Sequence, residues 1–194
     1  FTSKGDSPKA QMLMKSKGKN PKKAMILYGP PGTGKTTLAH VAAKEIKAEI
    51  FEINASDLRN KDKIREILRP AIEQKSLTKE KKVILVDEVD GISKVDWGGL
   101  PELLILAETS THPILITAND IWDKKFTALR NKSELVQIKE INYSTIKDVL
   151  INILKKEELF FPIELITKIA VKAKGDMRAA INDIQAASKL TDLK

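Results

Sequence analysis

Residues 29–36, GPPGTGKT, constrain the fold of this chain more than any other segment. They match the pattern G-x-x-x-x-G-K-[ST] and follow the apolar run MILY. Glycines at this spacing let backbone N–H groups turn toward phosphate oxygens at the start of a helix. The segment therefore predicts a strand, a phosphate-binding loop and a helix, rather than an ordinary strand-to-helix turn.

Each part of this loop has an expected role toward a nucleoside triphosphate. Lys35 is expected to neutralise charge on the β- and γ-phosphates, and the Thr36 hydroxyl to bind Mg²⁺. The residues expected to contact the nucleotide are Gly29, Pro30, Pro31, Gly32, Thr33, Gly34, Lys35, Thr36 and Thr37. Because kinases, GTPases and motors share this loop, it predicts a nucleotide but not its use.

Five short apolar runs alternate with helical patterns along the first two thirds of the chain: MILY, EIFEI, VILV, ILIT and LVQI. Strands that are apolar throughout, separated by segments of helix length, are typical of a parallel sheet covered on both faces. We therefore expect an α/β fold with a five-stranded parallel sheet, spanning residues 24–141 after a lysine-rich flank at 1–23.

The pattern changes near residue 142, where apolar residues begin to recur at helical spacing. Two such helices are expected before GDMRAAIND, which begins a third. Gly175 is suited to end the second helix and Asp176 to cap the third, which places Arg178 in its first turn. Residues 142–194 are thus expected to form a small three-helix lid domain.

The composition limits the kinds of site and partner. The chain has 194 residues, 42% of them hydrophobic, which is enough for a proper core. A net charge of +8 fits either a nucleic-acid partner or a generally lysine-rich protein. Without cysteine, disulfides and thiolate metal sites are excluded, and the two histidines are too few for a metal cluster.

The sequence shows neither a membrane-spanning apolar stretch nor a signal-peptide pattern. We therefore expect a soluble protein in the cytoplasm, associated with the nucleoid, or in the nucleus if the source is eukaryotic, with no membrane partner. Because the first residue is Phe1 rather than Met, the sequence is also expected to be a fragment.

Acidic residues follow the third apolar run, in VILVDEVDG at 83–91. A buried VILV strand would place Asp87 and Glu88 at its carboxyl end, where α/β sheets bind ligands. Asp87 is expected to take part in holding Mg²⁺, and Glu88 to orient and deprotonate a water for attack on the γ-phosphate. Read alone, the pair could equally be a solvated loop.

Two further residues are candidates for the same site. Asn119 follows the ILIT run, and its neutral amide is suited to bind the γ-phosphate or the attacking water, although an Asx turn is the alternative. Arg178 lies in the helical segment, where a guanidinium would read the phosphates if the lid folds over the nucleotide. Taken singly, Arg178 reads as a surface arginine.

These motifs in this order resemble the AAA+ ATPases, and more closely their clamp-loader branch, replication factor C. The resemblance covers nearly all of residues 24–190 and rests on INASD at 53–57, DEVDG at 87–91, ITAND at 116–120 and GDMRAAINDIQ at 175–185. Within the branch, DEVDGISKVDWGGLPELL is similar to the archaeal-type large subunit, including its Gly-Gly pair at 98–99. The resemblance implies ATP and Mg²⁺ as cofactors.

One departure from the family pattern agrees with the large-subunit branch. Small subunits of this family carry a Ser-Arg-Cys motif whose arginine reaches the neighbour's ATP site as a finger. In LRNKSELVQI at 129–138, Lys132 falls at that position, and lysine cannot make the planar two-pronged contact of arginine. Arg130, two residues earlier, remains open as a substitute.

The resemblance implies a motor that opens a sliding clamp and loads it onto primer–template DNA during replication. Its implied partners are clamp-loader small subunits, in a hetero-oligomer that is a pentamer in the family, together with the clamp and the DNA. Family members track template phosphates with the helix after NASD, which implies Arg59, Lys61 and Arg65 as DNA contacts, although a solvated helix is the alternative. The loop holding Val95 and Trp97 is a candidate clamp contact, or packs on its own domain.

Two regions of the family are expected to be absent: the segment before the first strand that clasps adenine, and the C-terminal collar domain. Three alternatives to clamp loading remain: a small-molecule P-loop kinase, a scaffold that binds nucleotide without hydrolysis, and another AAA+ DNA machine such as a helicase loader or branch-migration motor. The kinase needs several lid arginines, whereas the stretch after residue 142 holds only Arg178. Glu88 argues against the scaffold.

Overall fold

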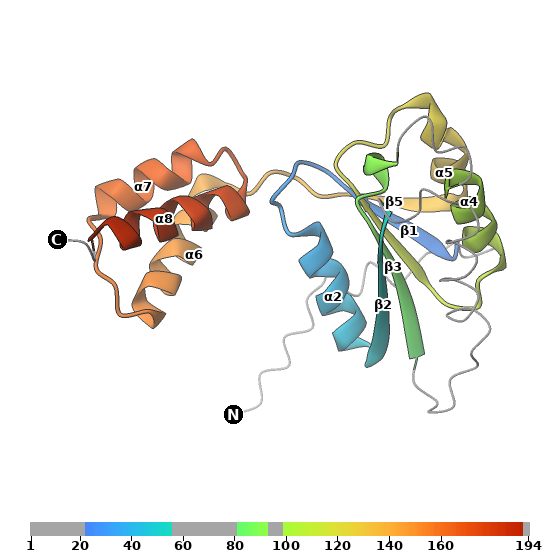
Figure 1. Ribbon diagram of the computed structural model, residues 1–194, viewed down its shortest axis with the longest axis horizontal. Helices are drawn as coiled ribbons and strands as arrows, with labels where there is room; N and C mark the ends of the chain where they lie inside the picture. The colour runs from blue at the N-terminus through green and yellow to red at the C-terminus, as the bar shows by residue number, and fades with distance from the viewer. Residues whose placement is uncertain (1–21, 56–80, 93–98, 192–194) are drawn as a thin grey trace. The chain divides into compact units, whose positions relative to one another are not determined.

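Five strands form one parallel sheet in the order β2-β3-β4-β1-β5 in a computed structural model that describes residues 22–55, 81–92 and 99–191 (Figure 1). The strands are β1 (Ala24–Tyr28), β2 (Ala48–Asn54), β3 (Lys81–Asp87), β4 (Ile114–Ala118) and β5 (Ser133–Gln137). Each contains one of the five apolar runs, or most of it, so the predicted five-stranded parallel sheet is confirmed.

The inner strands are apolar because both of their faces are covered. Ile26 and Leu27 of β1, Leu85 and Val86 of β3, and Ile116 of β4 are all completely buried. In the pairing of β3 with β4, Val86 lies opposite Ile116, so Asp87 and Thr117 are the next pair of residues along the two strands. The sheet therefore brings the carboxyl ends of these two strands to the same edge.

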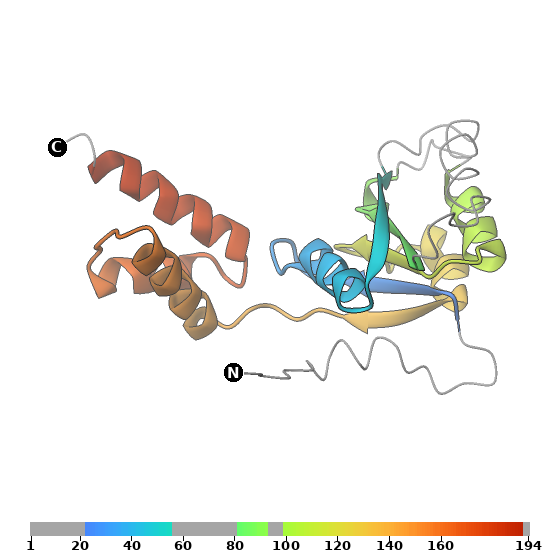
Figure 2. The same cartoon turned by 90° about the horizontal axis from the view of Figure 1, so that it is seen from below.

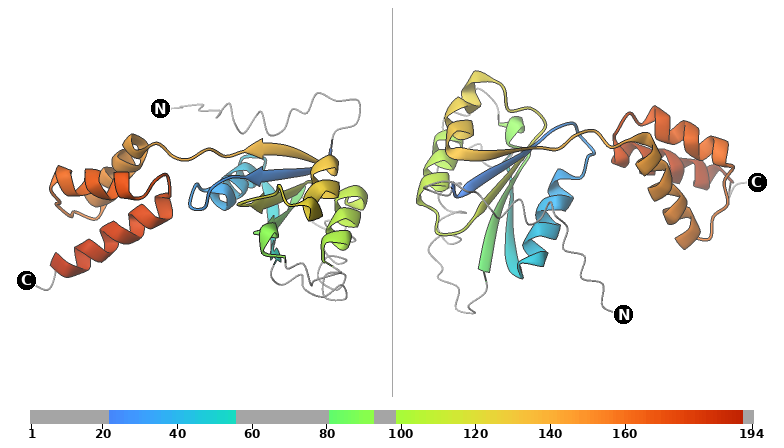
Figure 3. Two further views of the ribbon diagram at one scale, coloured as in Figure 1. Left: turned by 90° about the horizontal axis from the view of Figure 1, so that it is seen from above. Right: turned by 180° about the vertical axis from the view of Figure 1, so that it is seen from behind.

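Helices cover the sheet on both sides, with α2 on one face and α4 and α5 on the other (Figure 2). β2 and β5 are the two edge strands (Figure 3). The helices and 3-10 turns of this part are α2 (Lys35–Glu45), η2 (Val89–Gly91), α4 (Gly99–Thr109), η3 (Lys124–Phe126) and α5 (Thr127–Lys132). The small, apolar side chains of Ala39, Ala42 and Ala43 are the buried residues of α2 outside its first turn.

Three helices follow the sheet: α6 (Tyr143–Lys156), α7 (Ile163–Lys172) and α8 (Met177–Thr191). The side chain of Asn142 accepts a hydrogen bond from the Ser144 backbone N–H and caps α6. Gly175 has a φ of +88° in the turn before α8, and Asp176 accepts from the Ala179 N–H, so the predicted cap of the third helix is present.

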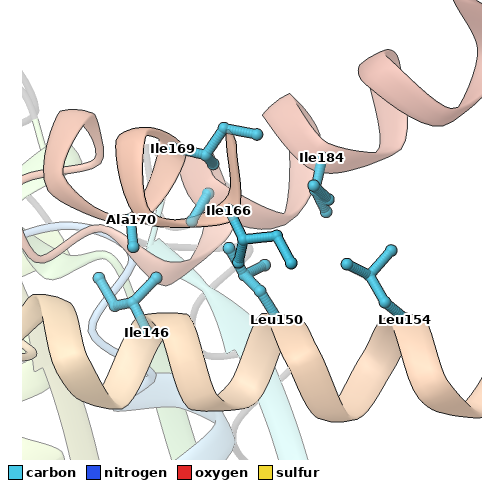
Figure 4. Close-up of a cluster of buried hydrophobic side chains, with 8 residues drawn as sticks. Ile146, Leu150, Leu154, Ile166, Ile169, Ala170 and Ile184 are labelled. Atoms are coloured by element: carbon cyan, nitrogen blue, oxygen red, sulfur yellow. The ribbon is translucent and has the colours of Figure 1, made fainter. Parts of the chain in front are cut away.

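The three helices share one buried apolar core, in which side chains from α6, α7 and α8 point toward one another (Figure 4). Ile146, Leu150 and Leu154 lie on one face of α6 at spacings of four residues. The remaining members are Ile166, Ile169 and Ala170 of α7 and Ala180 and Ile184 of α8. Burial of these side chains stabilises the helices as a unit.

The described residues separate into two compact units. One draws on residues 22–27 and 36–136, and the other on residues 28–35 and 137–191. The second unit thus contains residues 29–35 of the phosphate loop as well as the three C-terminal helices. No helix in the described ranges is long and apolar enough to cross a membrane.

Candidate nucleotide-binding site

The glycines of the phosphate loop adopt conformations or approaches that a side chain would prevent. Gly32 has a φ of +66° and Gly34 a φ of +83°, both in the left-handed region. A Cβ on Gly29 would lie 2.0 Å from the carbonyl oxygen of Ile138. Because this oxygen belongs to the backbone, it cannot move aside as the end of a flexible side chain could. The loop is further closed by the Thr33 hydroxyl, which donates to the Pro30 carbonyl over 2.9 Å.

Lys35 is buried, with 8% of its surface exposed. Its Nζ donates to the carbonyl oxygens of Gly29 over 2.9 Å and of Pro30 over 2.8 Å. A buried ammonium group needs such oxygen partners because it has been removed from water. The loop therefore holds an ammonium group whose hydrogen bonds to the two carbonyls could be replaced by hydrogen bonds to phosphate oxygens.

The start of α8 contacts the phosphate loop within the same compact unit. The Met177 backbone N–H donates to the Gly32 carbonyl over 3.0 Å. A Cβ on Gly32 would lie 1.8 Å from Oδ1 of Asp176, the same atom that accepts from the Ala179 N–H and caps the helix. Arg178, predicted to read the phosphates, lies next in this first turn and is exposed.

Asp87, at the end of β3, accepts hydrogen bonds from two hydroxyl groups on the same oxygen, Oδ1. Thr36, in the first turn of α2, donates over 2.9 Å. Thr117, the second-last residue of β4, donates a short hydrogen bond. The structure thus brings the two predicted metal ligands, Thr36 and Asp87, into direct contact.

Glu88 follows Asp87 and has a left-handed backbone conformation, with φ 56° and ψ 47°. Its side chain is exposed, and its backbone N–H donates to the Thr117 hydroxyl over 3.0 Å. Non-glycine residues rarely adopt this conformation, and those that do gather at functional sites. The backbone thus leaves the extended conformation of β3 at Glu88, directly before η2.

Asn119 directly follows β4 and is exposed. Its backbone N–H donates to Oδ2 of Asp90 over 3.1 Å. The predicted residues Asp87, Glu88 and Asn119 therefore lie at neighbouring strand ends. Thr117 and Asp90 were not predicted, because a threonine in an apolar run reads as an ordinary strand residue and Asp90 as part of a polar loop.

The two side chains considered for an arginine finger both have partners in this chain. Arg130 donates to the carbonyls of Ile121 and Asp123 and, over 2.9 Å, to the Thr127 hydroxyl. Its guanidinium lies 5.3 Å from the centre of the Trp122 ring. Lys132 forms an ion pair of 2.8 Å with Glu108.

The predicted DNA contacts Arg59, Lys61 and Arg65 lie outside the described residues, as do Val95 and Trp97 of the predicted clamp contact and the flank at 1–21. The structure therefore leaves these predictions as they stand.

The residues present fit a Mg²⁺ ion that also binds phosphate. A hydroxyl and a carboxylate oxygen, from Thr36 and Asp87, meet at 2.9 Å, and Mg²⁺ prefers such oxygen ligands in small number, completed by phosphates and water. In the part of the chain that the structure describes, no group of three or more His, Asp or Glu side chains could hold a metal by itself. The donor set suits a metal that arrives with its nucleotide.

Comparisons with known proteins agree with this geometry. Residues 25–141 match the family model "ATPase family associated with various cellular activities (AAA)". The chain is 49% identical over 88% of its length to the "Replication factor C large subunit" of Thermofilum pendens, covering 42% of that protein. It is 44% identical to the protein of that name from Pyrobaculum aerophilum and 42% identical to the one from Methanococcus maripaludis strain C5, over 84% of this chain in both cases and over 39% and 34% of those proteins. The chain thus spans less than half the length of these relatives.

Proposed function

Because this chain belongs to the AAA family of ATPases, we propose that it binds ATP with Mg²⁺ and hydrolyses it as the ATPase core of a sliding-clamp loader. The observation that carries the ATP part is the 2.9 Å hydrogen bond from Thr36 to Asp87. Thr36 is the last residue of the phosphate-loop motif, so this bond joins a residue of the motif to the acidic strand end.

The mechanism assigns one task to each residue. Thr36 and Asp87 would hold Mg²⁺ together with ATP, and the ion would supply positive charge near the phosphates. Lys35 leaves the carbonyls of Gly29 and Pro30 to bind the same phosphates, and the loop N–H groups add to this charge stabilisation. Glu88 takes the proton of the attacking water.

Two more residues complete the proposed site. The Asn119 amide orients the water or the γ-phosphate, since it offers hydrogen bonds without adding negative charge. Arg178 binds the phosphates from the first turn of α8. Because α8 also contacts the loop through Met177 and Gly32, lid position is coupled to the loop conformation.

We propose that the arginine finger for this site comes from another subunit. A finger acts at a neighbour's site, and this chain is expected to supply none, because Arg130 bonds to two carbonyls and a hydroxyl of its own chain and Lys132 pairs with Glu108. Hydrolysis then depends on assembly. This is expected for a clamp loader, in which small subunits, sliding clamp and primer–template DNA stimulate turnover.

The test uses the full-length protein with its small subunits, its clamp and primed DNA. Lys35→Ala should abolish stimulated turnover by weakening ATP binding. Glu88→Gln should keep ATP binding but lower turnover by about 100-fold or more, because it removes the general base. The matched control is Glu49→Gln, an exposed residue of β2 with the same chemical change, which should keep wild-type turnover.

Each contrary result has a meaning. Stimulated turnover that survives Lys35→Ala would overturn the mechanism. A Glu88→Gln protein that assembles and releases clamp at the normal rate would instead favour a scaffold that needs no hydrolysis. Stimulation by DNA without any effect of clamp or small subunits would leave ATP hydrolysis standing but point to another DNA machine of the same family.

A further inference from the structure

Thr117 is a buried polar side chain at the end of β4, with 1% of its surface exposed. Its hydroxyl donates to Asp87 Oδ1 and accepts from the Glu88 backbone N–H over 3.0 Å. One hydroxyl group therefore bonds to both consecutive acidic residues at the end of the neighbouring strand. Neither partner is local in sequence, since Thr117 lies 30 residues from Asp87.

The bond to Asp87 restricts the direction of its carboxylate. Thr36 and Thr117 donate to the same oxygen from two different elements, α2 and β4. Loss of one donor would leave the carboxylate held from one side only. Since second-layer hydrogen bonds of this kind orient the groups that bind a metal, Thr117 should affect how Asp87 meets Mg²⁺.

The bond to Glu88 acts on the backbone rather than on the side chain. A glutamate with φ 56° lies in a region that L-residues disfavour, so the surrounding structure must hold it there. The hydrogen bond from its N–H to Thr117 is one such restraint. If it is lost, Glu88 can relax toward an extended or right-handed conformation, which would move its carboxylate.

A third hydrogen bond joins the same strand ends. Asp90, after β3, accepts from the backbone N–H of Asn119, after β4. The backbone N–H groups of Glu88 and Asn119 are thus each bonded to a side chain from the other strand's end. These bonds restrain the backbone at both residues, which are the candidates for contact with the attacking water.

We propose that Thr117 is a positioning residue, whose hydroxyl sets the orientation of Asp87 toward the metal and of Glu88 toward water. The inference rests on the proposed ATP hydrolysis and adds a residue that touches neither nucleotide nor metal. The proposed role of Thr117 requires its hydroxyl group and not the shape of its side chain. Replacement by valine, which keeps the shape, and by serine, which keeps the hydroxyl, therefore tests it directly.

The experiment compares Thr117→Val, which keeps the shape, with Thr117→Ser, which keeps the hydroxyl, in the full-length protein assembled with its partner subunits, clamp and DNA. For Thr117→Val, kcat should fall about 10–100-fold, the usual effect of removing a second-layer partner, while KM for ATP changes less than about 3-fold. Thr117→Ser should stay within about 3-fold of the wild-type kcat.

A second readout does not depend on turnover. Binding of a fluorescent ADP analogue is measured with and without Mg²⁺. In Thr117→Val the gain in affinity on adding Mg²⁺ should shrink, while affinity without Mg²⁺ stays the same. Ser110→Ala is the matched control, because it also removes a buried hydroxyl, one that bonds to the carbonyl of His112, and it should leave kcat and the Mg²⁺ effect unchanged.

The outcomes separate this proposal from the proposed function. A wild-type assembly that does not hydrolyse ATP would refute the proposed function. An active wild type with an equally active Thr117→Val would overturn only the positioning role. The positioning role would also be overturned if Thr117→Ser lost as much kcat as Thr117→Val and melted at a lower temperature than the wild type. Altered packing would then explain the loss of kcat in both variants. If Thr117→Val does not fold, Thr117→Ala replaces it in the same comparison.

Discussion

Glycine is required at position 32 for two separate reasons: its own backbone conformation and the close approach of the Asp176 side chain. Its φ of +66° is disfavoured for any residue with a Cβ. A Cβ would also displace the Asp176 carboxylate that caps α8 through the Ala179 N–H. Glycine at position 32 is therefore required by the cap of α8 as well as by the backbone of the loop.

We predict that Gly32→Ala lowers the unfolding free energy by about 1–2 kcal/mol, from left-handed strain and a weakened helix cap, offset in part by the stiffer unfolded chain. Thermal unfolding of the full-length protein measures this. Gly91→Ala is the matched control, since nothing lies within 4 Å of a Cβ there, and it should change stability by less than about 0.5 kcal/mol. Equal melting temperatures for the two variants would contradict the role of Gly32.

Sequence reasoning placed Lys35 and Asp87, whose chemistry is visible in a motif, at the start of a helix and the end of a strand, where the structure has them, and their roles toward ATP stay predictions. It missed Thr117, because a hydroxyl inside an apolar strand has no local mark of the partner it meets across the sheet. It also left open whether Arg130 serves as an arginine finger, because the sequence does not show which groups the side chain contacts. The partners of that arginine depend on the path of the turn between β4 and α5, which no sequence pattern specifies.

The turn between β4 and α5 is held by Arg130, whose guanidinium bonds to the carbonyls of Ile121 and Asp123 and lies over Trp122. We predict that Arg130→Ala lowers the unfolding free energy by about 1–3 kcal/mol, because the partly buried Ile121 carbonyl and the exposed Asp123 carbonyl lose a charged donor and the contact with Trp122 is lost. Thermal unfolding of the full-length protein, with denaturant titration for the energy, checks this.

Lys132→Ala is the comparison for Arg130→Ala. It breaks only an exposed ion pair with Glu108, with side chains 57% and 52% exposed, so it should cost less than about 1 kcal/mol. If Arg130→Ala instead leaves the melting temperature unchanged and abolishes hydrolysis at a neighbouring subunit, Arg130 acts as a finger and our assignment is wrong.

At the level of elements, the periodicity of apolar residues was sufficient to predict the five strands and the three C-terminal helices. Caps added detail, since Asp176 was predicted to cap α8 and does. The strand order β2-β3-β4-β1-β5 could not be predicted from periodicity, because pairing between distant strands depends on long-range packing. That order is what places Thr117 beside Asp87 and so creates the network at the site.

For the whole molecule, the net charge of +8 favours a polyanionic partner, and the relatives named "Replication factor C large subunit" fit a proposal that this partner is DNA. We predict that the double variant Lys61→Ala, Arg65→Ala weakens binding to primed DNA. It should also reduce the slope of log affinity against log salt by about 1–2, because each lost phosphate contact releases about one counterion fewer. Fluorescence anisotropy across a salt series measures this.

Lys155→Ala, Lys156→Ala is the control for this prediction, because it removes the same charge from exposed positions in the last turn of α6. An equal change in the salt slope for both double variants would mean that net charge, and not the particular residues Lys61 and Arg65, attracts DNA.

With Glu88 as the proposed general base, its left-handed conformation makes stability and turnover favour different residues at this position. Asparagine or glycine adopts that backbone at lower free energy, yet neither supplies a carboxylate. A library selected only for survival at high temperature should therefore accumulate asparagine or glycine at this position, and one selected for growth should restore glutamate. Glutamate at this position is the residue expected from selection for turnover rather than for stability alone.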